Sequence, residues 1–452
     1  MPTVPALAQV LIVFALVVLA AARKVHLGLS AAVGGVVLAL WRGLGPLEVV
    51  RVALAEALSP DTLLLVALMA CIMAFSGAMK KSGAMESFSK TLAAVSPSPR
   101  FAMAAAPLLI GTLPMPGGAI LSAPLVDAMD PSRERSAASL SAANYWFRHG
   151  LELAWPLYPA FILTASITGL DAGRLIALNL YAVPVLFCLG LVFILPAPGR
   201  ALAKAVAPGA APGEAHGEAH GAAPATEPLR TRFAAFAAGI APLALVLGTY
   251  MALGALWGAI SPALGLGPSL EALVARFAPI FLGLLAGSVY LLSGPTGRGA
   301  FKGSVGPATL RLIAVIVGIR VFSVLLSTAG VAAAAASELA AAGIPSIAAV
   351  AALPFVAGLV TGIGFGYVGL AFPIVLGLAP VGGPLPRESA IVLAGAFGYA
   401  GMMLSPLHVC MVVSAEHFNV GLVSIIRRFA APLAAFLATA IAYASVLALW
   451  LP

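Results

Sequence analysis

Continuous apolar runs of about twenty residues limit the fold of this chain more than any other feature of its sequence. Two of these runs cover residues 4–22 and 62–79. Of the 452 residues, 62% are hydrophobic and only 9% are charged, whereas a soluble domain carries about 25% charged residues. Only lipid can cover so apolar a surface, so the sequence predicts membrane-spanning helices. A soluble enzyme is excluded, and so is a membrane β-barrel, whose strands alternate apolar and polar residues.

The basic residues indicate membrane orientation and not nucleic-acid binding. The net charge is +8, but the basic side chains are scattered over short connections and form no stripe with aromatic residues between them. We therefore expect a lipid bilayer around the chain and no nucleic-acid partner. The first apolar run has no basic residue before it and is followed by Arg23 and Lys24, which favours an uncleaved first helix.

Each of the three cysteines, Cys71, Cys188 and Cys410, lies inside an apolar segment. Their spacing fits neither a disulfide framework nor a zinc site. We interpret them as small hydrophobic residues, and the sequence predicts no metal centre.

Two interrupted segments stand out in the first half of the chain, residues 1–196. The stretch near 101–129 contains GTLPMPGGAILSAP, whose prolines and glycines suit two half-helices joined by a turn, that is, a re-entrant hairpin. The stretch at 134–168 contains Pro156 and Pro159, which predict a broken helix. The full spans of this half are predicted at 4–22, 25–41, 61–79 and 172–196.

A hydrophilic linker at 197–231 separates the halves. It is rich in Ala, Pro and Gly and contains the tandem GEAHGEAH, so we expect a disordered connector. Two histidines four apart could chelate a metal, but a plain connector is the favoured interpretation.

The second half, residues 232–452, has the same order of segments as the first. Full spans are predicted near 232–257, 273–293 and 308–342, the last with a surface extension, and a closing helix ends the chain. A second hairpin is expected near 345–376 and a second broken helix at 388–415. Shifted by about 250 residues, the halves overlay at equivalent positions, including Thr112 on Thr361, Gly117 on Gly366, Phe147 on Phe397, Pro156 on Pro406 and Leu157 on Leu407.

The distribution of basic residues tests this layout. If neither hairpin crosses the membrane, about ten crossings remain, and seventeen basic residues fall on one side against five on the other. The richer side is predicted to be cytoplasmic. We therefore expect an all-α polytopic protein of the cell inner membrane, with both termini outside, the linker in the cytoplasm, and two inverted repeats.

Inverted repeats with discontinuous helices are typical of secondary transporters, whose binding site lies near the midplane. A half-helix that starts within the membrane can hold an anion at its N-terminus. The second limbs of the hairpins are predicted to start near Gly117–Gly118 and near Gly366–Tyr367, and these four residues are candidates for substrate binding.

The broken helices suggest cation sites. Pro156 and Pro406 lack an N–H group, which would free the carbonyl groups of Glu152 and Met402 to bind a coupling ion such as Na⁺. Thr112 in the first hairpin, with Thr361 and Gly362 in the second, could supply further oxygen atoms, giving two pseudo-equivalent sites. The alternative is that these residues only kink packed helices.

The segment NYWFRHGLE (144–152) holds the richest polar cluster in an apolar span. Arg148 would attract an anionic substrate beside Asn144, while His149 or Glu152 would carry a coupling proton or bind a cation. The alternative is that Arg148 and Glu152, four residues apart, form only a structural ion pair.

The equivalent cluster in the second half is milder. It consists of Tyr399, Ser405 and His408 around Pro406, and we assign Ser405 and His408 to the substrate site, although a packed, hydrogen-bonded role for His408 stays open. Arg320, in another apolar run, could equally extend to the membrane surface or lie at the scaffold interface.

At two motifs, LPMPGGAILSAPLV (113–126) and NYWFRHGLELAWPLYP (144–159), the sequence resembles an uncharacterised prokaryotic integral-membrane family of the ion-transporter superfamily. Relatives in that superfamily include sodium–dicarboxylate and citrate symporters, gluconate permeases, arsenite permeases and the large membrane subunits of TRAP transporters. The resemblance implies a scaffold domain, a moving transport domain that carries both hairpins, and a homodimer. Dicarboxylate symporters carry a Ser-Asn-Thr signature at each hairpin tip, which this chain lacks, so the substrate is not carried over.

Two other functions remain open. A passive channel could be built from hairpins that enter from opposite sides. An intramembrane enzyme is less favoured, because the sequence has neither an H-E-x-x-H nor a G-x-S-x-G motif. The predicted function is cation-coupled transport of a small organic anion, without catalysis and with no cofactor beyond a coupling ion.

Overall fold

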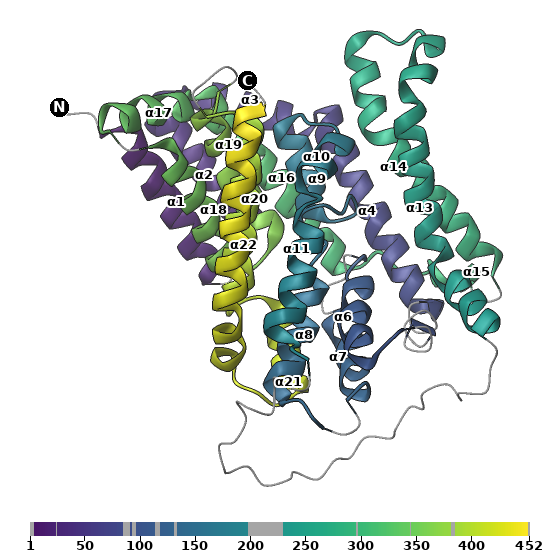
Figure 1. Cartoon of the computed structure of the whole chain (residues 1–452). Helices are drawn as coiled ribbons and strands as arrows, with labels where there is room; N and C mark the ends of the chain where they lie inside the picture. Colours follow the sequence, from purple (N-terminus) through teal and green to yellow (C-terminus); the bar gives the residue numbers. More distant parts are fainter. Residues whose placement is uncertain are drawn as a thin grey trace.

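The computed structural model describes residues 4–23, 25–84, 91–92, 96–113, 118–130, 133–197, 229–294, 297–343, 345–380 and 385–450. Throughout this part of the chain the regular structure is helical (Figure 1). Almost all of the predicted linker at 197–231 lies outside the described residues.

The first half contains four uninterrupted helices followed by the predicted hairpin, the broken helix and a closing helix. The four helices are α1 (Ala6–Ala22), α2 (Leu27–Trp41), α3 (Pro46–Ala57) and α4 (Pro60–Lys81). The hairpin is α6 (Pro99–Ile110) and α7 (Ala119–Ala128), and the broken helix is α8 (Ala137–Arg148) and α9 (Pro159–Thr168). The closing segment is α10 (Ala172–Asn179), α11 (Ala182–Leu189) and a π-helical turn, η1 (Gly190–Ile194).

The second half repeats this order. It begins with α13 (Leu229–Leu264), α14 (Pro268–Ser293), α15 (Gly297–Ala300), α16 (Pro307–Thr328) and α17 (Val331–Ala341). The second hairpin is α18 (Ser346–Thr361) and α19 (Gly364–Leu378), and the second broken helix is α20 (Arg387–Leu404) and α21 (Val409–His417). The closing helix is α22 (Leu422–Trp450).

Seven helical segments among the described residues are long and apolar enough to cross a membrane. They include the second broken helix, Arg387–His417. The three other predicted crossings are α1 and α2, which have 17 and 15 residues, and the broken pair α8–α9. The prediction of an all-α polytopic membrane protein is therefore confirmed, and α17 is a separate helix after α16 within the predicted segment 308–342.

Polar residues and prolines fix where many of these helices begin. The side chains of Ser59 and Ser98 accept hydrogen bonds from Thr62 N and Phe101 N, and each serine is followed by a proline at the first helical position. This arrangement satisfies backbone N–H groups that have no partner within the helix. Helix α18 ends at Gly362, which has φ +64° and acts as a left-handed cap.

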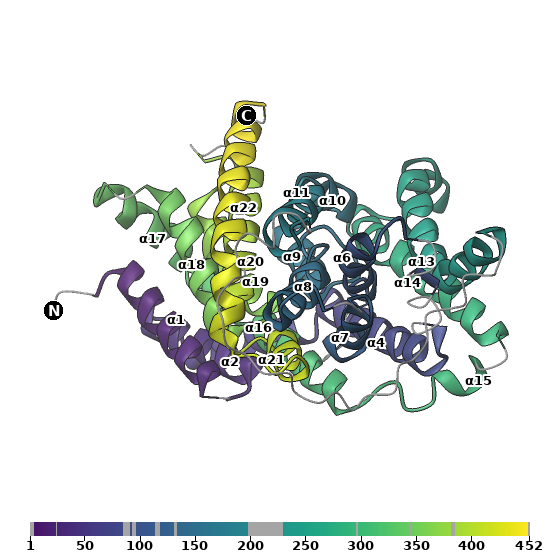
Figure 2. The ribbon, with the colours of Figure 1, turned by 60° about the horizontal axis from the view of Figure 1, so that its bottom comes forward.

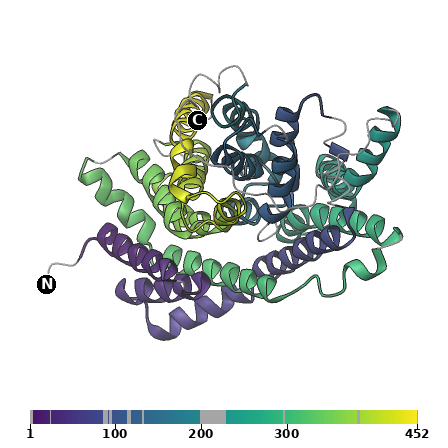
Figure 3. The same ribbon diagram turned by 90° about the horizontal axis from the view of Figure 1, so that it is seen from below.

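The helices form two layers, seen most clearly from below (Figure 3). One layer is a row in which α1 packs on α2, α2 on α16, α16 on α4, and α4 on α14, which pairs with α13. The other layer contains both hairpins, both broken helices and the closing segments, with α18 on α20, α19 on α9, and α21 on α7 and α8. Helix α1 and the α13–α14 pair lie at opposite ends of the molecule (Figure 2).

The two hairpins enter the molecule from opposite faces. In Figure 1, α6–α7 lie near the lower face, where η1 ends and α13 begins, whereas α18–α19 descend from the upper face, where α1 begins and α22 ends. The described termini and the two ends of the linker thus lie on opposite faces, as the layout from the basic residues requires. The division into repeats at 1–196 and 232–452 stays a prediction.

Candidate substrate and ion site

The site is built where four interrupted segments meet in the middle of the hairpin layer. These are the break between α8 and α9, the turns of the two hairpins, and the break between α20 and α21. The sequence predicted these segments but not which of them touch.

Arg148 lies against the turn of the first hairpin. Its side chain is 3% exposed, and a Cβ atom built on Gly118 would overlap its guanidinium group at Nη2. Gly118 is the N-cap of α7, so the guanidinium sits beside the N-terminus of the second limb, which begins where the sequence predicted. Gly117 lies outside the described residues.

Two aromatic residues fasten the first hairpin to the break that follows α8. Tyr158 Oη donates hydrogen bonds to the carbonyl groups of Gly111 at 2.6 Å and Arg148 at 3.2 Å. Trp155 Nε1 donates to the carbonyl of Thr112 at 2.8 Å. Neither aromatic residue was predicted as a site residue, although both lie in the LAWPLYP motif, where polar-tipped aromatic residues flank a proline.

Each of the two predicted threonine ligands lies at the end of the first limb of its own hairpin. Thr112 Oγ1 donates to Leu109 O at 2.6 Å, and Thr361 Oγ1 donates to Ala357 O at 2.7 Å. Each hydroxyl proton is therefore used within its own helix or turn, while its oxygen lone pairs remain for a cation.

Glu152 connects the first break to the second hairpin. Its Oε2 is 2.7 Å from His149 Nδ1, at hydrogen-bond distance and buried, and a Cβ atom on Gly364 would overlap its Oε1. The alternative of an Arg148–Glu152 pair is therefore corrected to a His149–Glu152 pair. The physical reason is that α8 ends at Arg148, so residues 148 and 152 do not share a helix face.

The second limb of the second hairpin starts two residues earlier than predicted. Helix α19 begins at Gly364, so Gly366 and Tyr367 lie inside its first turn. A Cβ atom on Gly366 would overlap Thr361 Oγ1, and the Tyr367 ring fills the space beside Gly398. These two residues pack helices together, and the glycine that approaches a charged group is Gly364.

The prediction of a freed carbonyl group at Met402 is wrong. Met402 O accepts hydrogen bonds from Ser405 N at 3.1 Å and from Tyr145 Oη at 3.4 Å, so it is not free. Helix α8 ends eight residues before Pro156, so this proline lies in the connection and does not itself break a helix.

The second break packs tightly on the second hairpin. At Gly362, a Cβ atom would lie 2.9 Å from both Ser405 Oγ and His408 N. The positive φ and this close approach both require glycine. Pro406 lies between α20 and α21, so Ser405, Pro406 and His408 occupy the predicted break.

Asn144 joins the two halves. It is fully buried in α8, and its Nδ2 donates to Ala119 O in the first hairpin at 3.3 Å and to Ser414 Oγ in α21 at 2.7 Å. Its amide nitrogen is thus held between α7 and α21.

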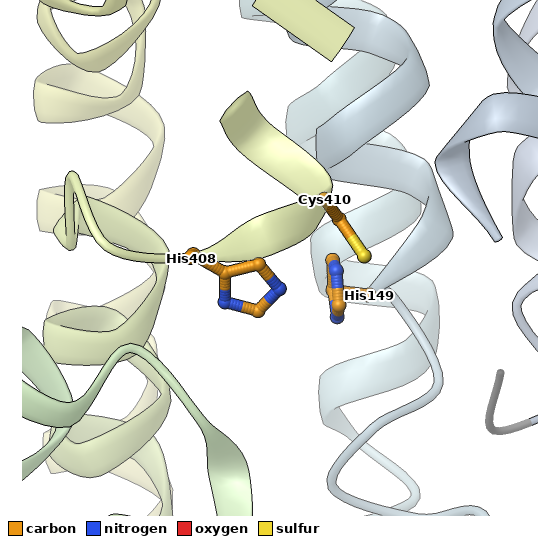
Figure 4. Close-up of side chains that lie close together, drawn as sticks. All are labelled: His149, His408 and Cys410. Atoms are coloured by element: carbon orange, nitrogen blue, oxygen red, sulfur yellow. The ribbon is translucent and has the colours of Figure 1, made fainter. Parts of the chain in front are cut away.

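His149, His408 and Cys410 form a buried cluster across the two breaks (Figure 4). One donor atom from each residue lies within 4.8 Å of the others. The imidazole rings cross at 83° with centroids 4.6 Å apart, and Tyr145 packs edge-on against both. Cys410 was interpreted as a plain hydrophobic residue, and its nearness to His408 in the sequence was the only signal available.

A small cavity of about 20 Å³ adjoins Glu152. Its polar lining residues are Glu152, Thr164, Asn179 and Tyr367, and the rest of the wall is mainly apolar. This volume holds about one water molecule or a small ion. The cavity makes Glu152 the charged group nearest to a space that a coupling cation could occupy.

The contacts of Arg320 decide between the two roles that the sequence left open, extension to the membrane surface and a place at the scaffold interface. It forms an ion pair with Glu56 and donates to Thr62 Oγ1 at 3.2 Å and to Ser166 Oγ at 3.1 Å. Arg320 therefore links α16 to α3 and α4 in the row of helices and to α9 in the hairpin layer.

The sequence matches the model of a family described as Protein of unknown function (DUF401), over residues 6–207 and 298–447. The unmatched stretch between them contains α13 and α14. This match agrees with the predicted resemblance to an uncharacterised family, whose place in the ion-transporter superfamily stays a prediction. Among curated proteins, none matches the sequence.

The fold is shared with solved structures. One of them is the Alcanivorax borkumensis YdaH transporter, whose crystal structure is described as revealing an unusual topology. The two chains are 15% identical, the similarity covers 85% of this chain and 84% of that chain, and the TM-score is 0.52. At this identity the likeness shows a shared multi-pass membrane fold.

Proposed function

We propose that this chain, which belongs to the family described as Protein of unknown function (DUF401), is a secondary active transporter of a small organic anion. The observation that carries the proposal is the position of Arg148, whose buried guanidinium lies against the N-cap of the half-helix α7. A full positive charge and the positive end of a helix dipole then act on the same point in the membrane. The fold shared with the YdaH transporter supports transport as the general activity.

Coupling to a cation follows from the opposite charge at the second hairpin. The Glu152 carboxylate lies between His149 and the start of α19 and faces the small cavity. It can either bind a proton or share Na⁺ with nearby oxygen atoms. We propose Glu152 as the coupling residue, with the Thr112 and Thr361 oxygens as further ligand candidates.

The two-layer arrangement suits an elevator-type movement. The hairpins and broken helices pack mainly on one another and meet the row of α1, α2, α16, α4 and α14 through fewer elements. We propose that the hairpin layer moves as a transport domain against that row, and that a homodimer of rows forms the scaffold. The protein lies in the cell inner membrane, with both termini outside and the linker in the cytoplasm.

A passive channel is the second candidate, because hairpins enter from both faces. Uptake into proteoliposomes separates the two functions. Thermal-shift screening against organic anions, with and without Na⁺, first identifies a ligand, because a ligand that binds the native state raises apparent stability. A transporter then accumulates this anion above its external concentration when an inward Na⁺ or proton gradient is imposed. Equilibration without accumulation would establish a channel.

A further inference from the structure

His149, His408 and Cys410 combine features that neither packing nor anion binding explains. The exposed fractions of these residues are 5% for His149, 6% for His408 and 7% for Cys410. His149 Nε2 and His408 Nδ1 are buried without a hydrogen-bond partner among the described residues. Buried polar atoms are nearly always satisfied, so an unpartnered imidazole nitrogen of His149 in a cluster with a second imidazole and a thiol indicates a missing ligand.

We propose that these three residues bind one late transition-metal ion, with Zn²⁺ as the best match. Two imidazole nitrogens and one thiolate are a ligand set that zinc takes, with one position left for a fourth ligand. Sodium is not a candidate at this point, because thiolate sulfur prefers softer metal ions. The site goes beyond the proposed function, which uses Arg148, the hairpin turns and Glu152, and the two proposals share only Glu152.

The distances allow a metal after a small contraction. Zn–N bonds of about 2.0 Å and Zn–S bonds of about 2.3 Å in a tetrahedral site place ligand atoms about 3.3–3.6 Å apart. The donor atoms here lie within 4.8 Å of one another. His408 is the N-cap of α21 and Cys410 is its second residue, so a shift of about 1 Å at the start of this short helix would complete the geometry.

Glu152 provides the usual support for a histidine ligand. Its Oε2 accepts from His149 Nδ1 at 2.7 Å, which fixes the ring and leaves Nε2 as the metal-binding nitrogen. Carboxylate–histidine–metal arrangements of this kind orient the ligand and make it more basic. The carboxylate and a Cys410 thiolate together balance the two charges of the ion, which matters because an uncompensated charge within the membrane is costly.

A reactive thiol is the competing explanation. Cys410, His149 and Glu152 could act as nucleophile, base and orienting carboxylate. That arrangement has no role for His408, which belongs to the same cluster. The metal site uses all three donors, so the geometry favours it.

Cobalt titration of the full-length protein tests the site without any transport measurement. The protein is purified in detergent, stripped with a chelator, and titrated with CoCl₂ alone and then with ZnCl₂. We expect one equivalent of Co²⁺ with thiolate-to-cobalt charge-transfer absorption, which Zn²⁺ displaces. Binding at His216 or His220 of the linker gives no such band, because that segment has no cysteine.

Matched variants show which cysteine gives rise to the charge-transfer band. Cys410→Ser should lose it, whereas Cys71→Ser and Cys188→Ser should keep it. Glu152→Gln should keep the band but weaken cobalt affinity about 10–100-fold. Size-exclusion elution checks folding, and His408→Gln, which should also weaken binding, replaces Cys410→Ser if that variant aggregates.

Three results would overturn the site: no charge-transfer band in the wild type, a band that persists in Cys410→Ser, or alkylation of Cys410 that Zn²⁺ does not slow. The last result, without a band, would establish the reactive thiol instead. Failure of anion uptake would leave the cobalt result unaffected, so the two proposals fail separately.

Discussion

The guanidinium of Arg148 occupies the space that a side chain at Gly118 would need. Gly118 is the N-cap of α7, so the absence of a Cβ atom lets a buried positive charge reach the end of a half-helix. This relationship ties a glycine in the first hairpin to a charge at the end of α8, and it gives the most direct test of the anion site.

Gly118→Ala should weaken anion binding while the protein stays folded. The added Cβ atom meets only the far end of a flexible side chain, so Arg148 can move aside without a backbone shift. We expect KM for the transported anion to rise about tenfold or more, which corresponds to about 1.4 kcal/mol. Gly254→Ala is the control, because a Cβ atom there meets nothing within 4 Å. Equal KM values for the two variants would remove Arg148 from the substrate site.

The sequence predicted where the helices break because each break carries its own local signal. Prolines and glycines mark the hairpins, and polar residues inside apolar runs mark the broken helices. The spacing rule for charged pairs failed at Arg148 and Glu152, because it assumes a continuous helix and α8 ends at Arg148. Likewise, Gly364 and Gly366 suit a helix start equally well, so the sequence did not identify the first residue of α19.

The sequence did not predict which residues of the two halves touch. Glu152 meets Gly364, and His149 meets His408 and Cys410, across separations of 212 to 261 residues in the sequence. Metal motifs are found in sequences through ligands that lie close together, and this cluster takes its ligands from both halves. Only the packing of the two breaks shows that Cys410 has polar neighbours.

Tyr158→Phe should destabilise the hairpin layer. The hydroxyl donates to the buried carbonyl groups of Gly111 and Arg148, and its loss leaves them unsatisfied at a cost of about 1–3 kcal/mol. We expect a lower Tm in detergent. The control is Tyr290→Phe, since Tyr290 is 41% exposed and its substitution should change stability by less than about 0.5 kcal/mol. Equal Tm values for both variants would contradict the fastening role of Tyr158.

Arg320 should stabilise the contact between α16 and its neighbours through charge pairing. Arg320→Leu leaves the Glu56 carboxylate without its ion-pair partner, so Tm should fall. Glu56→Leu with Arg320→Leu should recover most of the loss, because no uncompensated charge remains. A double variant as unstable as the single one would show that Arg320 acts through Thr62 and Ser166 instead.

The proposed orientation predicts where a thiol reagent reaches the chain. Ala211→Cys, in the linker outside the described residues, should not react with an impermeant maleimide in intact cells, and should react after the membrane is opened. Leu47→Cys is the matched control, because Leu47 lies in α3 near the upper face and is 84% exposed. Both variants need Cys71→Ser and Cys188→Ser, since these two cysteines are exposed. Labelling of Ala211→Cys in intact cells would reverse the orientation.

Substitutions at Glu152 and Gly364 test whether cation binding is coupled to anion transport. Glu152→Gln keeps the shape of the side chain but removes its charge, so anion binding should survive while accumulation driven by a Na⁺ or proton gradient is lost. Gly364→Ala should act in the same direction, because its Cβ atom displaces Glu152 Oε1 and also lies 2.9 Å from Ala160 Cβ.

Counterflow, which exchanges labelled for unlabelled anion without a gradient, separates anion binding from cation coupling in proteoliposomes. We expect counterflow to persist and gradient-driven uptake to fall at least about tenfold, equivalent to about 1.4 kcal/mol. Normal accumulation by Glu152→Gln would exclude this carboxylate from coupling and leave the hairpin oxygens of Thr112 and Thr361 as the remaining cation ligands.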